Sequence, residues 1–128
     1  IDALVRTSFE VMGTLTRIGA AHDLSLTQLR VLGILRDRRL RMTGLAAYLG
    51  LDKSTMSGLV DRAEKRGLLA RGKNPEDGRV VDVFMTEAGQ ELAEQINDEI
   101  RQALVPLTDR LDAPRRDQVT QLLETLVG

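Results

Sequence analysis

Basic and hydroxyl-bearing side chains gather between residues 51 and 86, where their types and spacing favour contact with a polyanion. A helix expected after Asp52 would bury one apolar side and turn five polar residues outward: Lys53, Ser54, Ser57, Arg62 and Lys65. Two short strands would follow, joined by the polar turn 74–78, which ends in Arg79. Hydroxyls and backbone amides suit phosphate oxygens, and a guanidinium can pair with the edge of a guanine. The stretch therefore predicts a DNA-binding module.

The candidate DNA contacts, on these grounds, are Lys53, Ser54, Thr55, Ser57, Arg62, Lys65, Lys73 and Arg79. Plainer roles stay open for several of them. Ser54 and Thr55 could simply cap the helix after Asp52. Asp61 lies four residues before Lys65, which is the spacing of an ordinary surface ion pair on a helix. Arg66 could contact the β-hairpin that follows the helix, or a second subunit, as well as DNA.

Arg79 is the strongest single candidate, because the narrow minor groove of A·T-rich DNA concentrates negative potential and attracts an inserted arginine. Asp77, two residues earlier, would then brace the turn or pair with Arg79 so that the guanidinium points outward. The alternative is that both residues serve only the hairpin turn.

Other kinds of chemistry find little support in the sequence. It has no cysteine, a single histidine (His22), no glycine-rich phosphate loop and no carboxylates clustered at useful spacing. We therefore expect no enzyme, no metal site and no cofactor. No apolar run reaches 18 residues and no signal-peptide pattern is present, so a cytoplasmic protein is expected.

Charge is distributed unevenly, although the net charge is only −1. Residues 36–79 hold eleven basic against six acidic side chains, whereas residues 80–128 hold four basic against ten acidic. A basic middle segment in a mildly acidic chain indicates a local anion-binding surface. A solvated charged face is the alternative on charge alone.

Hydrophobic periodicity predicts one mostly helical domain over residues 1–128, with a small β-hairpin. The elements expected in order are a helix over 2–20, a helix of about ten residues capped near Ser25, a short helix capped by Thr43, a helix from Asp52 to Gly67, strands over 68–72 and 80–85, a long helix over 87–111, and a last helix after Asp112. Arg38, Arg39 and Arg41 would form a basic connection. Two short helices joined by a turn at Gly50 are typical of a helix-turn-helix.

The first and last helices carry more apolar residues than one small domain can cover, Val119, Leu122, Leu123 and Leu126 among them. Pairing of the first helix, the long helix over 87–111 and the last helix with their copies in a second subunit would bury the excess, so we expect a homodimer. Closure of the same residues on their own domain is the alternative.

Residues 42–92 resemble the MarR family of bacterial transcription regulators. The resemblance rests on LDKSTMSGLVDRAEKRGLLAR, which would be a recognition helix running into the first wing strand, and on Asp77-Gly78-Arg79 followed in register by Thr86-Glu87-Ala88-Gly89. The order of the flanking helices fits the same layout.

The resemblance implies a winged helix-turn-helix homodimer, mostly α with a small β-wing. About 25–86 would form the DNA-binding part, and 1–24 and 87–128 the dimerisation helices. The dimer would bind a pseudopalindromic operator, with the recognition helix in the major groove and Arg79 in the minor groove. It would act as a repressor released by a small phenolic or other lipophilic effector.

One residue departs from the family pattern, because members commonly carry arginine where this sequence has Gly58. A glycine inside a helix costs roughly 0.8–1 kcal/mol relative to alanine and supplies no contact. This keeps a second hypothesis open, a winged-helix module for protein–protein assembly with weak or no DNA binding.

Further residues have two interpretations each. His22 could sense a ligand or pH, or be an ordinary residue at the end of a helix. An effector pocket could be lined by Phe9, Met12, Arg17 and Phe84, each of which also suits the core or the surface. Arg115 and Arg116 would lie in solvent or pair across the dimer.

Overall fold

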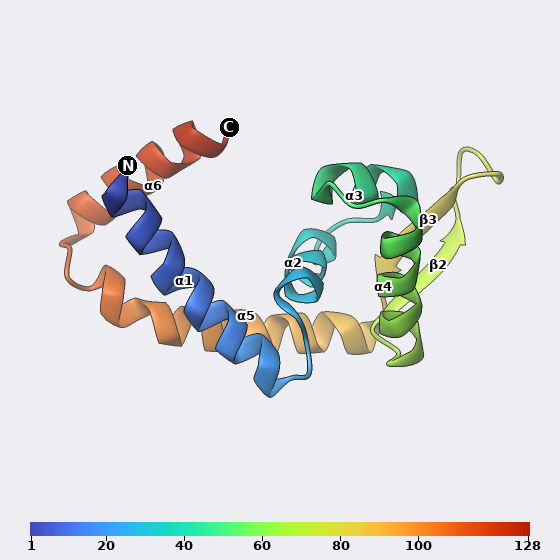
Figure 1. Cartoon of the computed structure of the whole chain (residues 1–128), viewed down its shortest axis with the longest axis horizontal. Coiled ribbons are helices and arrows are strands. Elements are labelled where there is room, and N and C mark those ends of the chain that lie inside the picture. Colours follow the sequence, from blue (N-terminus) through green and yellow to red (C-terminus); the bar gives the residue numbers. More distant parts are fainter.

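Two parts joined by a long helix make up the computed structural model of the chain, which describes residues 1–128. The elements in order are α1 (Asp2–Ala21), α2 (Leu26–Leu35), β1 (Leu40–Arg41), α3 (Met42–Leu49), α4 (Lys53–Lys65), β2 (Leu69–Lys73), β3 (Val81–Met85), α5 (Glu87–Thr108) and α6 (Ala113–Val127). Figure 1 shows α2–β3 gathered at one end and α5 running from there to the other, where α6 and both termini lie. The predicted mostly helical fold with a small sheet is confirmed.

Local sequence signals set most of the helix starts. The Ser25 hydroxyl accepts a hydrogen bond from the Gln28 backbone N–H in a full capping box. The side chains of Asp52, Thr86 and Asp112 cap α4, α5 and α6, each by accepting one hydrogen bond from a backbone N–H of the first turn. The short third helix is present, but its predicted cap was wrong, because Arg41 rather than Thr43 occupies the N-cap position and no side chain caps it.

The sheet has one strand more than the sequence suggested. Its order is β1-β3-β2 and every pairing is antiparallel. The residues expected to form a basic connection include β1, whose Leu40 and Arg41 pair with Val83 and Asp82. A strand of two residues is too short to show an alternation of apolar and polar residues, so only its pairing with β3 identifies it.

Other boundaries also differ from expectation. Both wing strands begin one residue later than predicted. The fifth helix ends at Thr108, two residues after Pro106, rather than at Leu111.

The hydrophobic core lies almost wholly in the α2–β3 part. Leu35, Leu45, Met56, Val60 and Val83 are fully enclosed there. The core also takes in Ala93 and Ile96 of α5, which joins the long helix to this part of the molecule.

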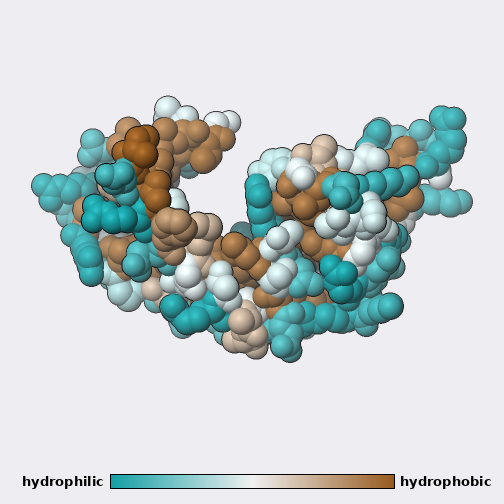
Figure 2. Space-filling view, viewed as in Figure 1, coloured by the Kyte–Doolittle hydropathy of each residue, from teal (hydrophilic) through white to brown (hydrophobic).

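The terminal helices contribute very little to that core. In α1 only Gly19 is buried, and α6 has no buried residue at all. Exposed apolar side chains run along both helices, from Leu4 and Phe9 to Leu122 and Leu126. Figure 2 shows hydrophobic surface gathered where α1 and α6 lie. None of the helices is long and apolar enough to cross a membrane.

The start of α5 is packed tightly against the turn before β2. A Cβ added to Gly89 would lie 3.0 Å from the carbonyl carbon of Leu68 and closer still to its oxygen. That oxygen accepts a hydrogen bond from the Thr86 backbone N–H at 3.1 Å. Gly89 is therefore required for the close approach of α5 to the base of the hairpin.

We predict that Gly89→Ala lowers the free energy of unfolding by about 1–3 kcal/mol, because the added methyl group forces the backbones apart. Gly33→Ala is the matched control, since nothing lies within 4 Å of its Cβ position. That control should raise the free energy of unfolding by roughly 0.5–1 kcal/mol. Urea unfolding of both variants checks this, and equal stabilities would contradict it.

Candidate nucleic-acid interface

Helix α4 has one buried apolar side and one exposed polar side, as its sequence predicted. Met56, Leu59, Val60 and Ala63 face the core. The exposed side carries the predicted contacts Lys53, Ser54, Thr55, Arg62 and Lys65. The packing of the first set fixes which way the second set faces.

The start of α4 is held by Asp52, whose carboxylate accepts a hydrogen bond of 2.7 Å from the Thr55 backbone N–H. This bond, with a further one from the Thr55 side chain, lowers the pKa of Asp52 below its ordinary value. Thr55 therefore takes part in the N-cap of α4, which is one of the two roles that its sequence position allows. The exposed Lys53 and Ser54 complete the first turn.

Arg71 of β2 reaches back to α4 and holds its middle. Its guanidinium contacts the carboxylates of Asp61, at 2.7 Å, and Glu64. Burial alone would lower the pKa of Arg71, but the hydrogen bonds to these two carboxylates raise it above its ordinary value. Asp61 therefore pairs with Arg71 and not with Lys65.

Ser57 shares this attachment and is less free than its neighbours on α4. Its hydroxyl and its carbonyl oxygen each accept a hydrogen bond of 3.2 Å from Arg71. The residue is half-buried, unlike the other predicted contacts of the helix. The sequence indicated a hydroxyl on the outer face but not the arginine beneath it.

Gly58 leaves room that Arg62, one turn later, partly fills. A Cβ at Gly58 would lie 3.4 Å from an Nη atom of Arg62 and near nothing else. The guanidinium of Arg62 thus lies beside the position where relatives were expected to carry arginine. The absence of a side chain at Gly58 does not leave this surface without a cation.

The wing presents Arg79 to solvent, with 93% of its side chain exposed. Asp77 accepts hydrogen bonds from the Arg79 backbone N–H at 3.0 Å and from Nε at 3.2 Å. The backbone bond first, and then the side-chain bond, lowers the pKa of Asp77. Lys73, the other predicted wing contact, is exposed at the end of β2.

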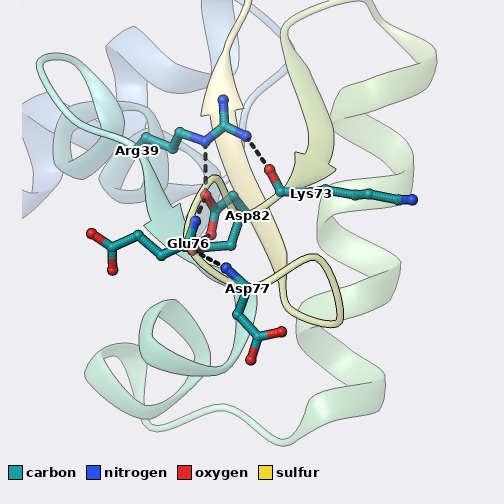
Figure 3. Close-up of polar contacts among 6 residues, drawn as sticks. Arg39, Lys73, Glu76, Asp77 and Asp82 are labelled. Carbon is teal, nitrogen blue, oxygen red and sulfur yellow. Dashed lines mark hydrogen bonds and ion pairs between the residues drawn. The ribbon is translucent and has the colours of Figure 1, made fainter.

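A buried carboxylate lies at the base of the wing, and the sequence analysis did not identify it. Asp82, in the middle strand, is 2% exposed. It accepts a hydrogen bond of 2.8 Å from Arg39 Nε and two, of 3.0 and 3.2 Å, from the Asn74 amide. The bonds from Asn74 and then Arg39 lower the pKa of Asp82 below 3.8. Figure 3 shows this cluster between the strands. A single Asp within VVDVFM was the available signal.

The residues that could line an effector pocket do not line the cavity between α2 and α5. A cavity of about 70 Å³ lies between α2 and α5, lined by Leu32, Arg36 and Ile96 among others. Phe9, Met12, Arg17 and Phe84 are not part of its lining. Phe84 instead lies under the guanidinium of Arg39, 4.5 Å from its ring centre.

The corner between α1 and α2 connects the terminal helices to α4. Arg66 donates hydrogen bonds of 2.9 Å to the carbonyl oxygens of His22 and Asp23. His22 in turn contacts Glu99 of α5 at 2.6 Å. Arg66 therefore holds this corner. No group of His, Cys, Asp or Glu side chains in the chain is suited to hold a metal ion.

Comparison with known proteins gives matches along the whole chain. A family model described as the MarR family matches residues 22–80. The uncharacterized HTH-type transcriptional regulator YfiV of Bacillus subtilis is 35% identical over 71 residues, which are 55% of this chain and 44% of that protein. The chain thus matches less than half the length of that relative.

Two further matches extend over nearly all of the chain. The homoprotocatechuate degradative operon repressor of Escherichia coli is 26% identical over 127 residues, 98% of this chain and 86% of that protein. The crystal structure of CouR from Rhodococcus jostii RHA1, bound to p-coumaroyl-CoA, superimposes with a TM-score of 0.80 and 26% identity. It covers 97% of this chain and 88% of that one.

The lowered pKa of Asp82 predicts a pH-dependent contribution to stability. Because this pKa is below 3.8 in the folded chain, the carboxylate stabilises the fold above the unfolded-state pKa and loses this effect as pH falls through the folded one. Asp82→Asn should therefore lower the midpoint of thermal unfolding at neutral pH. Its difference from wild type should shrink as the pH falls below the ordinary pKa of an aspartate and through the lowered one, and a difference independent of pH would contradict this.

Proposed function

We propose, on the premise that the chain belongs to the MarR family, that it is a DNA-binding transcription regulator. As a homodimer it would bind a pseudopalindromic operator and repress transcription until a small effector releases it. The observation that carries the proposal is the pairing of an exposed polar face on α4 with an exposed arginine, Arg79, on the wing. Both are held in place by contacts from inside the domain.

The first contact is that of α4 with the major groove. Lys53, Ser54 and Thr55 lie in its first turn, where backbone N–H groups and the helix dipole favour a phosphate. Arg62 and Lys65 follow about two and three turns later on the exposed side. Arg71 contacts Ser57, Asp61 and Glu64 of the helix, which supports a rigid α4.

The second contact is that of the wing with the adjacent minor groove. Arg79 is exposed, and Asp77 restrains its backbone N–H and its side chain together. An arginine held before binding loses less side-chain freedom when it enters the groove. Asp77 thus has a bracing role, and Lys73 at the end of β2 adds a nearby charge.

The dimer would be formed by α1, α5 and α6. The exposed apolar residues of α1 and α6 need a partner, and nothing in the chain itself covers them. Two copies also present two α4 helices, as a pseudopalindromic operator requires.

The effector would be a small phenolic or lipophilic anion. The cavity between α2 and α5 is mostly apolar and has Arg36 in its lining. It touches both the DNA-binding part and the long helix, so a ligand there would favour one arrangement of the two over another. The relatives support this class of ligand, since one is named for a phenolic degradation operon and another was solved with p-coumaroyl-CoA.

A protein–protein assembly module is the second candidate, and Gly58 is the observation that favours it. The two functions differ in their response to salt, because contacts with phosphates make the affinity for DNA fall steeply as salt rises. A gel-shift titration at several salt concentrations, on a duplex selected by the protein from a random-sequence pool, separates them. The assembly module predicts no selected sequence and no steep salt dependence.

Arg79→Ala should weaken binding to the selected duplex by roughly 1–3 kcal/mol, because it removes the minor-groove contact, and should leave the dimer folded. Arg115→Ala is the control, as this arginine of α6 is exposed and distant from the wing. Fluorescence anisotropy measures both. An unchanged affinity of the Arg79 variant would remove this residue from the interface.

The dimer is tested on α6. Leu122→Glu places a charge on its exposed apolar side, where the leucine is 59% exposed in the single chain, and should turn the dimer into a monomer. Gln121→Glu adds the same charge on nearly the opposite side of the helix and should leave the dimer intact. Sedimentation velocity gives the masses. A Leu122 variant that stays dimeric, or a wild-type monomer, would contradict this interface.

A further inference from the structure

We propose that Arg39 is a positioning residue of the wing, which holds Arg79 in place through Asp82, Asn74 and Asp77. The proposal rests on the proposed function in that Arg79 is taken to contact DNA. Its geometry is independent of that function, because four consecutive polar contacts connect the residues before β1 to the wing arginine.

The first contact fixes Arg39 itself. Its Nε donates to Asp82 Oδ2 at 2.8 Å, and an Nη atom donates to the carbonyl oxygen of Lys73, also at 2.8 Å. The flat face of the guanidinium lies over Phe84. Figure 3 shows Arg39 between Asp82 and Lys73, bridging the middle strand and the end of β2.

Gly72 makes room for this arrangement. A Cβ at Gly72 would lie 3.1 Å from an Nη atom of Arg39 and 3.1 Å from the ring of Phe84. Gly72 pairs with Asp82 across the sheet. A side chain opposite the buried carboxylate would have to displace the guanidinium or the Phe84 ring by a few tenths of an ångström.

The second contact passes from Asp82 to the wing turn through Asn74. The Asn74 amide donates to both carboxylate oxygens of Asp82. Its own side-chain oxygen accepts from the backbone N–H groups of Glu76, at 2.9 Å, and Asp77, at 3.2 Å. One side chain therefore joins the buried carboxylate to the backbone of the turn.

The last contact is that between Asp77 and Arg79. Because the Asp77 backbone is held by Asn74, the carboxylate that orients Arg79 is itself fixed in position. The series runs from Arg39 through Asp82, Asn74 and Asp77 to the arginine at the tip. Removal of the Arg39 side chain should therefore make Arg79 and the wing turn more mobile.

Arg39 is poorly suited to contact DNA itself. Two of its donor groups are engaged inside the domain, and its charge compensates the buried Asp82. An uncompensated carboxylate beside DNA would also repel the phosphates. Arg41 is the matched control, because it faces Asp82 in the sheet register but is exposed and donates no hydrogen bond to it.

The first test needs no DNA. In Arg39→Ala, hydrogen exchange measured by NMR should become about fivefold faster at the backbone N–H groups of Glu76, Asp77 and Arg79. The same groups should exchange at the wild-type rate in Arg41→Ala. Unchanged exchange in a folded Arg39→Ala overturns the proposal. Should that variant fail to fold, Arg39→Lys, which keeps the charge but cannot bridge Asp82 and Lys73, replaces it with the same expected direction.

The second test is a double-mutant cycle on the selected duplex. Arg39→Ala should weaken binding about fivefold when Arg79 is present and have no effect when Arg79 is alanine. An equal loss in both backgrounds overturns the proposal, since Arg39 would then act on DNA directly. If Arg79→Ala alone has no effect, the wing contact of the proposed function fails, and the exchange experiment still decides the role of Arg39.

Discussion

A buried carboxylate in the middle of the sheet is the constraint on which the geometry of the wing depends. Asp82 lies on β3, between β1 and β2, and is almost fully enclosed. An unpaired charge there would be costly, so its partners must be present whenever the sheet is formed. Those partners, Arg39 and Asn74, come from the segment before β1 and from the wing turn, which the sheet brings together. Folding of the sheet and placement of the wing are therefore one event.

Apolar burial divides the molecule differently. The enclosed side chains belong to α2, α3, α4 and the sheet, whereas α1 and α6 leave theirs in solvent. The enclosed side chains make the α2–β3 part rigid, whereas the exposed apolar side chains of α1 and α6 have the character of an uncovered subunit interface. α5 belongs to both, since Ala93 and Ile96 join the core while its far end reaches α6. In the proposed dimer, movement of α5 against α2 is the route by which a ligand between them would alter the spacing of the two α4 helices.

Much of this fold follows from sequence, and the part that does not has a common cause. The caps at Ser25, Asp52 and Thr86 and the buried side of α4 are local, so short-range patterns predicted them correctly. The partners of Asp82 and Arg71 are set by tertiary contacts, which no single stretch of sequence encodes. For the same reason the sequence places β1 in a connection and offers Lys65, rather than Arg71, as the alternative partner of Asp61. The tip residues Asp77 and Arg79 were predicted because they lie two residues apart, and Arg39 was missed because it lies far away in the chain.

In the proposed complex, a domain held rigid from within presents α4 and Arg79 together to DNA. The most direct measurement is a crystal structure of the dimer on its selected duplex. It should place the first turn of α4 in the major groove, with Arg79 in the adjacent minor groove and Arg39 still bonded to Asp82. The two recognition helices should lie about 34–36 Å apart. A complex in which Arg39 leaves Asp82 to bind a phosphate, or in which Arg79 points into solvent, would contradict the account.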